Sequence, residues 1–331
     1  MLNYSPISER YDGGMSYRRC GESGLQLPLI SLGLWHNFGS ADFGYHKDLI
    51  FYAFNSGVIH FDLANNYGEV PGSAEANFGK ILGGHLKAYR NELVVSSKAG
   101  YRMHSGPYGD GGSRKYLINS LNESLKRLQT DYVDIFYHHR PDPDTPLEET
   151  MQALDSMVKS GKALYIGLSN YNYETVIEAQ KILKSLGSPC IIHQLRYNLL
   201  DRSAEGDNLL ELNSIGIGSI AYCPLAQGIL SKRYLEGIPS GSRASRVNYP
   251  DMNSEYIQSY LPVIRGLNQI AEERKQTLAQ MSLAWCLRRK ELASVIIGVS
   301  QLEQLKENLK AFDNLDFSDA CLEAIDAVLN Q

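Results

Sequence analysis

The segment SRKYLINSLNESLKRLQTDYVDIFYHH (113–139) carries the pattern that decides the fold. Its first half places four leucines on one helical face: Leu117, Leu121, Leu125 and Leu128. Ser113 precedes this face, where its hydroxyl can cap a helix. The second half, YVDIFYH (132–138), is almost continuously apolar, as is typical of a strand that is buried on both faces of a parallel sheet. The segment therefore predicts an amphipathic helix that leads into a buried strand.

The same unit recurs along the chain. The apolar, β-branched runs that we interpret as strands are 27–34, 58–62, 93–97, 132–138, 163–169, 190–194, 218–222 and 294–298. Eight buried strands that alternate with amphipathic helices predict an α/β fold, a (β/α)8 TIM barrel formed by one domain, 1–331. Segment 17–29 is expected to form a β-hairpin at the bottom of the barrel, and segment 318–329 an extra C-terminal helix.

A doubly wound open sheet is the competing architecture. Dinucleotide-binding sheets of that kind carry a G-x-G-x-x-G fingerprint after an early strand. No early strand is followed by this fingerprint, and the glycine-rich GDGGSR (109–114) does not match it. We therefore favour the barrel, and we expect 109–114 to be a loop that leads into a helix.

Composition excludes several classes of function. The 331 residues are 43% hydrophobic and 21% charged, as in an ordinary globular protein. A net charge of −5 argues against a nucleic-acid binder, which needs a basic stripe. The five cysteines show no C-x-x-C spacing, so we expect neither a metal site nor disulfides, and a reduced, cytoplasmic setting fits best. We expect no signal peptide and no membrane span, because the chain has no apolar run of the required length.

Polar side chains collect where the predicted strands end. Asp62 ends the second strand and Tyr67 follows on its loop, while Lys98 follows the third strand. His138 and His139 come at the end of the fourth strand. The loop around Tyr67, rich in Asn and Gly, also suits an ordinary turn. Because the catalytic residues of such barrels come from the C-terminal ends of the strands, we expect these side chains to share one site.

These side-chain types suit proton delivery to a carbonyl group. A tyrosine has a reference pKa near ~10, and a nearby lysine ammonium favours the phenolate and lowers that pKa. An aspartate paired with the lysine would hold it charged and in place. A neutral histidine can orient a carbonyl oxygen by donating one hydrogen bond. Reduction of that carbonyl would also need a hydride, which a cofactor must supply.

The chain resembles the aldo-keto reductase family along nearly its whole length. The matching stretches are FDLANNYG, SAEANFGKILG, VVSSKAG, DYVDIFYHHRPD, GKALYIGLSNY, AYCPLAQGIL and IIGVSQLEQLKENL. The resemblance implies a catalytic tetrad of Asp62, Tyr67, Lys98 and His139. His139 is preferred to His138 because it directly precedes RPD. The resemblance also implies that NADPH/NADP is the cofactor and is bound without a Rossmann fold, which agrees with the missing glycine fingerprint.

The resemblance extends to cofactor-binding residues. It implies that Tyr222 stacks on the nicotinamide ring, that CPLAQG (223–228) holds the pyrophosphate through backbone N–H groups, and that a helix N-terminus receives a 2′-phosphate. The stretch QLEQLKENL at that last place is also a plain amphipathic helix. The full expected set is Gly33, Trp35, Asp62, Ser169, Asn170, Gln194, Tyr222, Cys223, Pro224, Leu225, Ala226, Gln227, Gly228, Arg233, Arg243, Gly298, Ser300, Gln304, Glu307 and Asn308.

Within the family, GYRMHSGPYGDGGSRKY and IHQLRYNLLDR are most similar to the bacterial L-glyceraldehyde 3-phosphate reductase subgroup, near the β-subunits of voltage-gated potassium channels. This similarity implies a small aldehyde substrate, such as glyceraldehyde 3-phosphate or methylglyoxal, and a homo-oligomer. The expected substrate pocket consists of Trp35, Tyr67, Tyr101 and His139.

Four residues leave the substrate pocket open to interpretation. Arg102 and Arg140 could hold a substrate phosphate, although arginines on loops are commonly just solvated. Two positions depart from the subgroup: His104 stands where a Trp is common, and Cys223 replaces a usual small hydroxyl residue or neighbour before the Pro-Leu-Ala loop.

Two other functions remain open from the sequence. A nicotinamide-binding regulatory subunit of the channel β-subunit type would tolerate a degraded tetrad. His139 is intact where the resemblance implies Asn in channel subunits, which favours an enzyme. A barrel isomerase or aldolase acting on a sugar phosphate would need no nicotinamide. No metal, nucleic-acid or membrane partner is expected.

Overall fold

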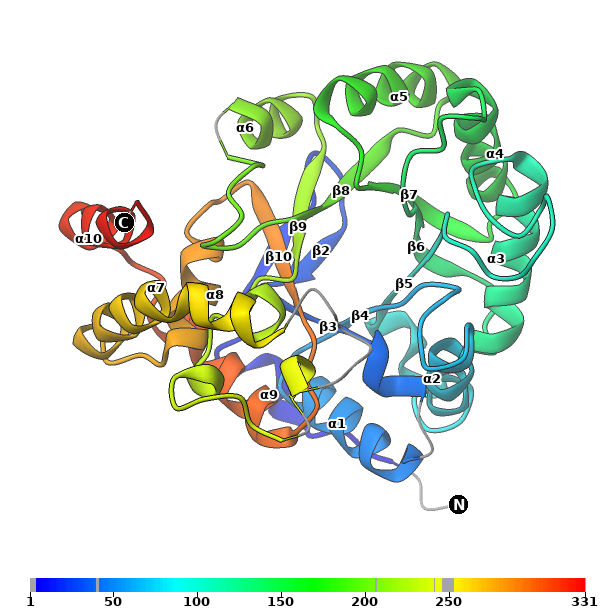
Figure 1. Ribbon diagram of the computed structural model, residues 1–331. Helices are drawn as coiled ribbons and strands as arrows, with labels where there is room; N and C mark the ends of the chain where they lie inside the picture. The colour runs from blue at the N-terminus through cyan, green and yellow to red at the C-terminus, as the bar shows by residue number, and fades with distance from the viewer. Residues whose placement is uncertain (1–3, 40–41, 206, 241, 246–252, 331) are drawn as a thin grey trace.

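A closed barrel of eight parallel strands forms the centre of the protein (Figure 1). The computed structural model describes residues 4–39, 42–205, 207–240, 242–245 and 253–330. In barrel order, the strands are β10 (Leu292–Ile297), β3 (Ile30–Gly33), β4 (His60–Asp62), β5 (Val94–Ala99), β6 (Val133–His138), β7 (Ala163–Ser169), β8 (Cys190–Arg196) and β9 (Gly218–Tyr222). The predicted (β/α)8 TIM barrel is confirmed.

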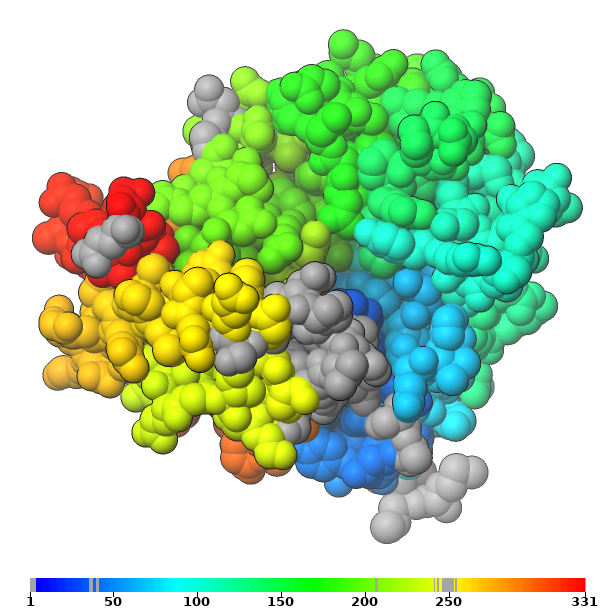
Figure 2. All heavy atoms as spheres, in the orientation of Figure 1, coloured from blue at the N-terminus to red at the C-terminus, as the bar shows by residue number. Residues whose placement is uncertain are grey.

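Helices surround the barrel and connect its strands. They are α1 (Phe43–Asn55), α2 (Ser73–Gly83), α3 (Arg114–Leu128), α4 (Leu147–Lys159), α5 (Tyr173–Leu186), α6 (Asp207–Ser214), α7 (Ser254–Glu273), α8 (Leu278–Leu287), α9 (Leu302–Leu309) and α10 (Asp319–Leu329). The predicted extra helix at 318–329 is α10, which packs beside α7 at the edge of the molecule (Figures 1 and 2). Among the described residues, no helix is long and apolar enough to cross a membrane.

Helix α3 and strand β6 form as their sequence predicts. The four leucines of the predicted face are all buried, so this face packs against the barrel. The Ser113 hydroxyl caps the helix by accepting a hydrogen bond from the Tyr116 backbone N–H at 3.3 Å. Gln129, at φ 54°, takes the left-handed conformation that ends many helices. The segment 109–113 is a loop that leads into α3, as expected.

The N-terminal hairpin closes the lower end of the barrel. Strand β1 (Tyr17–Arg19) pairs antiparallel with β2 (Gln26–Pro28), and Leu27 is fully buried among the side chains of the barrel interior. The predicted hairpin is confirmed, but the predicted strand 27–34 is wrong at its start. Its first two residues belong to β2, and the barrel strand begins only at Ile30, because Pro28 ends the hairpin pairing.

Several strand ends differ from the predicted ones by two residues. Strand β5 was predicted as 93–97 but runs to Ala99, so Lys98 lies inside the strand and not after it. Strand β8 likewise runs on to Arg196, whereas β4 begins only at His60. Hydrogen-bond pairing with the neighbouring strand sets these ends, and the hydrophobic pattern of a single strand does not contain that information.

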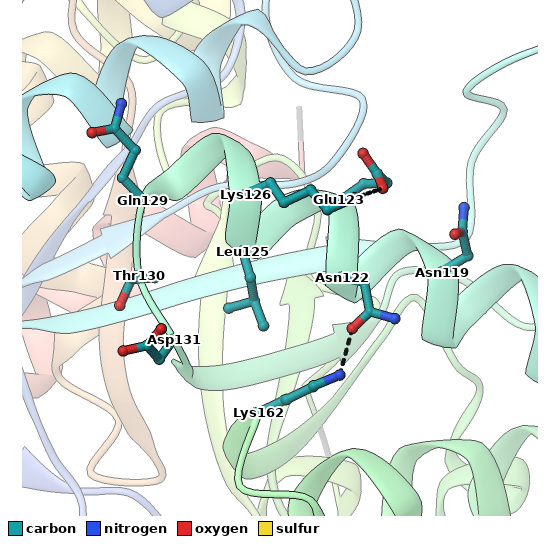
Figure 3. A pocket seen from close by; sticks show the side chains of 9 residues that line it. All are labelled: Asn119, Asn122, Glu123, Leu125, Lys126, Gln129, Thr130, Asp131 and Lys162. Carbon is teal, nitrogen blue, oxygen red and sulfur yellow. Dashed lines mark hydrogen bonds and ion pairs between the residues drawn. The ribbon is translucent and has the colours of Figure 1, made fainter.

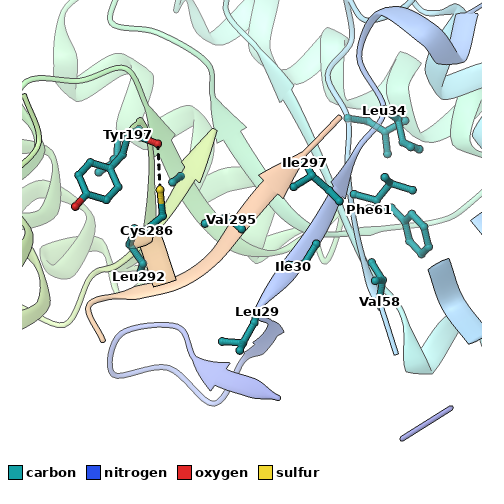
Figure 4. Packing of buried hydrophobic residues seen from close by; sticks show 14 of the residues in the cluster. Leu29, Ile30, Leu34, Val58, Phe61, Tyr197, Cys286, Leu292, Val295 and Ile297 are labelled. Carbon is teal, nitrogen blue, oxygen red and sulfur yellow. Dashed lines mark hydrogen bonds between the residues drawn. The ribbon is translucent and has the colours of Figure 1, made fainter. Parts of the chain in front are cut away.

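Alternation along the strands separates the barrel interior from the outer core. Figure 4 shows Ile30 of β3, Phe61 of β4 and Ile297 of β10, which belong to the core between the barrel and its helices. Because successive side chains point to opposite faces of a strand, His60 and Asp62 on either side of Phe61 point into the barrel. The same period of two brings the polar residues of the site together.

One glycine makes room for an aromatic ring inside the barrel. Tyr137 of β6 is fully buried, and its ring centroid lies 5.8 Å from Lys98 Nζ. Gly167 pairs with Tyr137 in the register of β6 and β7. A Cβ atom at Gly167 would lie 2.3 Å from the tyrosine ring. The absence of a side chain at Gly167 therefore allows the ring to fill the space below the lysine.

Substitution Gly167→Ala should destabilise the fold by about 1–3 kcal/mol, the usual cost of overpacking a tight core. The measurement is the free energy of unfolding in urea. Gly44→Ala is the matched control, since a Cβ at Gly44 on helix α1 would have no heavy atom within 4 Å. The control should be neutral or slightly stabilising. A Gly167→Ala protein as stable as the control would contradict this view of the packing.

Candidate active site

A buried lysine is the centre of the site. Lys98 of β5 is fully buried, and its ammonium donates to Asp62 Oδ2 at 2.6 Å and to the Leu63 carbonyl at 2.8 Å. The third contact is with the Tyr67 hydroxyl at 3.2 Å. An ammonium has three protons and accepts nothing, so these contacts use its whole donor capacity. The phenol oxygen is therefore the acceptor, and the tyrosine keeps its own O–H proton for another partner.

The loop that carries Tyr67 is a turn held by its own backbone. The Tyr67 N–H donates to the Ala64 carbonyl at 3.1 Å, and the Tyr67 carbonyl accepts from the Ala74 N–H at 3.2 Å. Gly68 has φ 103°, and a Cβ there would lie 2.1 Å from the Ser73 hydroxyl. The glycine thus lets the loop fold onto the start of α2. The loop is both the turn and the support of Tyr67.

Burial controls the ionisation of the site. Burial lowers the pKa of Lys98 below its usual value, while the Asp62 carboxylate opposes that shift. Burial, with the negative charge of Asp62, raises the pKa of Tyr67 well above its usual value. The lowering of the tyrosine pKa expected from the sequence is therefore wrong, because loss of solvation and the charge of Asp62 both favour the neutral phenol. A phenol in this environment holds its proton at neutral pH.

The two adjacent histidines point to opposite sides of the sheet. The His139 ring lies 5.8 Å from the Tyr67 ring and 4.7 Å from the Tyr101 ring, centroid to centroid. Burial and the charge of Lys98 hold the pKa of His139 well below its usual value, so its imidazole is neutral. His138 instead meets the Tyr171 hydroxyl at 2.5 Å through Nδ1. The structure thus brings the ring of His139 next to Tyr67 and pairs His138 with Tyr171.

The residues expected at the nicotinamide surround this cluster. Gln194, at the end of β8, donates from Nε2 to Asp62 Oδ1 at 3.1 Å. Asn170, next to Ser169, donates to the His139 carbonyl at 2.9 Å and accepts from the Tyr222 hydroxyl at 2.7 Å. The two amides that could hold a carboxamide are therefore in direct contact with Asp62 and His139.

The segment 223–228 has an unusual backbone. Cys223, Ala226 and Gln227 have φ values of 52°, 45° and 59°, in the left-handed region. This conformation costs roughly 1–2 kcal/mol for each non-glycine residue and is concentrated at functional sites. The Ala226 N–H donates to the Cys223 carbonyl at 2.9 Å, and the Gly228 N–H donates to the Leu225 carbonyl at 2.8 Å. These bonds hold the segment, which includes Pro224, as a tight turn.

The remaining cofactor candidates lie farther along the chain. Arg233 is exposed in a short 3-10 turn, and the side chain of Arg243 lies outside the described residues. Gly298 and Ser300 follow β10 and are exposed, and Gln304 accepts from the Ser300 N–H at 2.9 Å.

Helix α9 has fewer free N–H groups at its start for a 2′-phosphate than the sequence suggests. Its first N–H, at Leu302, already donates to the Tyr45 hydroxyl at 2.9 Å. Glu307 is half-buried, and Asn308 is buried against the rest of the fold. The adenosine end of the expected cofactor site is therefore the part that the geometry supports least.

Aromatic residues surround the tyrosine of the expected substrate pocket. The Trp35 ring lies 6.1 Å from the Tyr67 ring and is 40% exposed, next to Gly33 at the end of β3. The backbone of Tyr101 is fixed by helix α3, because the Tyr101 carbonyl accepts a hydrogen bond from the Tyr116 hydroxyl at 2.6 Å. Trp35, Tyr67, Tyr101 and His139 thus lie together.

The two candidate phosphate-binding arginines differ in their contacts. Arg140 donates to the Gly100 carbonyl at 2.8 Å and pairs with Asp110 at 2.9 Å. This arginine fixes the loop that carries Tyr101. Arg102 is exposed and donates to the Ser105 hydroxyl at 3.2 Å. His104, which departs from the subgroup pattern, is exposed on the same loop.

A surface hollow lies near the opposite end of the barrel from the tetrad. Figure 3 shows it between α3 and Lys162, where Lys162 Nζ donates to Asn122 Oδ1 at 2.7 Å. Asp131 and Lys162 come just before β6 and β7, so this hollow is at the N-terminal ends of the strands. Catalytic groups of such barrels lie at the other end.

Sequence reasoning missed residues that support the tetrad. Ser96 donates to Asp62 Oδ1 at 2.7 Å, and His60 contacts Ser96 at 3.0 Å. Both lie two residues before a tetrad member, so the period of two along their strands could have found them. Asn65, which donates to the Tyr116 hydroxyl at 3.1 Å, gives no such signal because its partner is on a distant helix.

The barrel and this site define an aldo-keto reductase. A model of the Aldo/keto reductase family matches residues 29–330, and the chain belongs to that family of oxidoreductases. Family membership supports a nicotinamide cofactor and an aldehyde substrate.

Comparison with known proteins gives the relatives of the chain. It is 50% identical over 326 residues to L-glyceraldehyde 3-phosphate reductase of Escherichia coli K12, which covers 96% of this chain and 93% of that protein. It is 37% identical over 305 residues to a probable voltage-gated potassium channel subunit beta of Oryza sativa subsp. japonica. The match covers 90% of this chain and 92% of that protein. The crystal structure of a thermostable aldo-keto reductase with the inhibitor epalrestat matches with a TM-score of 0.74 at 29% identity, covering 95% of this chain and 100% of that one.

Breaking the buried ion pair should cost far more than breaking an exposed one. Substitution Lys98→Met leaves Asp62 buried without its countercharge, and should lower the free energy of unfolding by about 3–5 kcal/mol. Lys126→Met is the matched control, because Lys126 pairs with Glu123 on the surface of α3 at 2.6 Å and should lose no more than about 1 kcal/mol. Urea unfolding measures both. Equal small losses would contradict the buried pairing.

Proposed function

We propose that this protein reduces small aldehydes to alcohols with NADPH, and that Tyr67 gives the proton to the carbonyl oxygen. The observation that carries the proposal is the saturated ammonium of Lys98, whose third donor ends on the Tyr67 oxygen at 3.2 Å. Because the ammonium is only a donor, its contact with the Tyr67 oxygen leaves the phenol proton free for a substrate oxygen. The 50% identical reductase of Escherichia coli supports the same reaction class.

Each tetrad residue has a distinct role. Lys98 stabilises the negative charge that develops on Tyr67 as the proton leaves, and Asp62 holds the ammonium charged in a buried place. His139 is neutral, and its Nδ1 is buried, so Nε2 is the nitrogen that would meet a substrate oxygen. Proton transfer by a positioned side chain contributes roughly 10²–10⁴-fold to a rate.

The cofactor site would lie beside the tetrad. NADPH, when bound, supplies the hydride. Ser169, Asn170 and Gln194 would hold the carboxamide, and Tyr222 would cover the nicotinamide ring. The contact between Gln194 and Asp62 at 3.1 Å supports this adjacency. The segment 223–228 would lie along the pyrophosphate, and Arg233 and Arg243 would meet the adenosine phosphates.

Glyceraldehyde 3-phosphate is the substrate best supported, since the relative from Escherichia coli acts on it by name. Methylglyoxal is a second small aldehyde of the right size. Arg140 is bound to Gly100 and Asp110, so Arg102 is the arginine that would meet a substrate phosphate. The five cysteines are free thiols, which suits the reducing cytoplasm. Homo-oligomerisation stays a prediction.

A nicotinamide-binding regulatory subunit is the second candidate. The 37% identity to a probable channel subunit beta favours it. The presence of His139 and the three hydrogen bonds of the Lys98 ammonium favour the enzyme, because a regulatory subunit has no need of a proton donor. Assay of an aldehyde panel with NADPH and NADH separates the two, since a regulatory subunit would bind the cofactor with negligible turnover.

Substitution Tyr67→Phe should lower kcat for aldehyde reduction by about 10²–10⁴-fold, because it removes only the proton that is transferred. NADPH affinity, measured by fluorescence titration, should stay close to that of the wild type. Aldehyde reduction that is undiminished in Tyr67→Phe would show that the mechanism is wrong.

Substitution Arg233→Ala should weaken NADPH binding roughly 10- to 150-fold and leave NADH binding nearly unchanged, since a charge-assisted bond to phosphate is worth about 1.5–3 kcal/mol. Lys232→Ala is the control, because this neighbouring exposed cation pairs with Glu272 at 3.6 Å. Fluorescence titration with both cofactors measures the effect. An equal loss for NADPH and NADH would remove Arg233 from the phosphate site.

A further inference from the structure

We propose that His60 is a positioning residue for the reduction, and that it acts as the Nε2–H tautomer by holding the Ser96 hydroxyl so that this hydroxyl donates to Asp62. The inference rests on the proposed roles of Lys98 and Tyr67. It assigns a role to a fully buried histidine that touches neither the phenol nor the lysine through any hydrogen bond among the described residues.

The inference starts from a polar chain that crosses the barrel interior, consisting of Ser294, Ser31, His60 and Ser96. These residues come from four adjacent strands, β10, β3, β4 and β5, and all are fully buried. The contacts are 2.6 Å from Ser294 Oγ to Ser31 Oγ, 2.8 Å from Ser31 Oγ to His60 Nδ1, and 3.0 Å from His60 Nε2 to Ser96 Oγ. Buried polar groups stay in a core only when they are paired, as these are.

Proton counting fixes the direction of the bonds at Ser96. An Asp62 carboxylate can only accept, so Ser96 gives its single hydroxyl proton to Asp62 Oδ1 at 2.7 Å. The other contact of Ser96 must then be a bond that its oxygen accepts. His60 is the donor of that bond, and its Nε2 carries the proton.

The other end of the polar chain fits the same tautomer. A neutral imidazole protonated at Nε2 has a free lone pair at Nδ1, so Ser31 donates there. The Ser294 hydroxyl lies 2.6 Å from the Ser31 oxygen and 3.3 Å from the Leu29 carbonyl, and in this tautomer it gives its single proton to Ser31, the nearer acceptor. The charged groups that face His60 are Asp62, which favours the imidazolium, and Lys98, which opposes it. Burial outweighs both and lowers the pKa of His60 to about 4. The direction of donation therefore runs from β10 to Asp62.

The consequence reaches the phenol through Asp62. Its Oδ1 accepts from Ser96 and Gln194, and its Oδ2 accepts from Lys98 at 2.6 Å. Without a correctly oriented Ser96, the carboxylate can turn and its contact with Lys98 lengthens. The ammonium then supports the Tyr67 oxygen less well. Glu75 also acts on Lys98, and Tyr101, Tyr222 and Cys223 act on Tyr67, but none of them belongs to the polar chain.

The kinetic test compares two substitutions of one residue. His60→Leu removes both nitrogens, and should lower kcat about tenfold with the KM for NADPH unchanged, since Ser96 loses the donor that orients its own bond to the Asp62 carboxylate. It should also shift the pH profile of kcat. His60→Gln keeps one donor and one acceptor, and should recover most of kcat. His193→Leu is the control, because His193 is also buried in the barrel sheet but lies outside the polar chain.

A second measurement does not depend on activity. Nitrogen-15 NMR of the histidine rings in the wild-type protein reports the tautomer directly, and the His60 signals are those missing in His60→Gln. We expect a proton on Nε2, none on Nδ1 and no titration between about pH 6 and 8. A proton on Nδ1, or an imidazolium at neutral pH, would overturn the inference, because Ser96 could then not donate to Asp62 as described.

The outcomes separate this inference from the proposed function. Full activity of Tyr67→Phe would contradict the proposed function, whichever tautomer His60 adopts. Equal kcat losses in His60→Leu and His60→Gln, or a matching loss in His193→Leu, would overturn the role of His60 in an enzyme that still depends on Tyr67.

Discussion

The buried ammonium of Lys98 is the constraint on which the rest of the site depends. A charge that is removed from water must have all of its donors satisfied, or its burial would cost several kcal/mol. The three acceptors come from Asp62 at the end of β4, from the Leu63 carbonyl and from the Tyr67 hydroxyl. One segment, 62–67, therefore supplies every partner, and the turn within it places the phenol.

The interior of the barrel combines a polar chain with an apolar cluster. Strands β10, β3, β4 and β5 contribute Ser294, Ser31, His60 and Ser96 to the polar chain, and the apolar cluster includes Ile135, Tyr137, Ile192 and Ile220 as well as Val94 of β5 and Ile296 of β10. A low local dielectric strengthens every bond of the polar chain and makes each unpaired group costly. The fold and the chemistry thus share residues, because the packing that closes the barrel also fixes the carboxylate next to the lysine.

Much of the fold and the centre of the site could be predicted from the sequence, because both follow local patterns. Buried strands and amphipathic helices repeat clearly enough to define the barrel, and strand ends point to Lys98 and Tyr67. The split of 27–34 between hairpin and barrel could not be predicted, since pairing partners decide it. The direction of the Tyr67 pKa was also missed, because burial depends on every neighbour. His60 looked like part of an ordinary apolar strand.

The central claim is that Lys98 leaves Tyr67 a protonated phenol that is ready to donate. The most direct measurement is carbon-13 NMR of the protein labelled at the ζ carbon of tyrosine, with the Tyr67 signal identified by its absence in Tyr67→Phe. We predict that this carbon keeps the shift of a neutral phenol from about pH 6 to 9. A phenolate shift at neutral pH would contradict the claim, since the tyrosine would then have no proton to give.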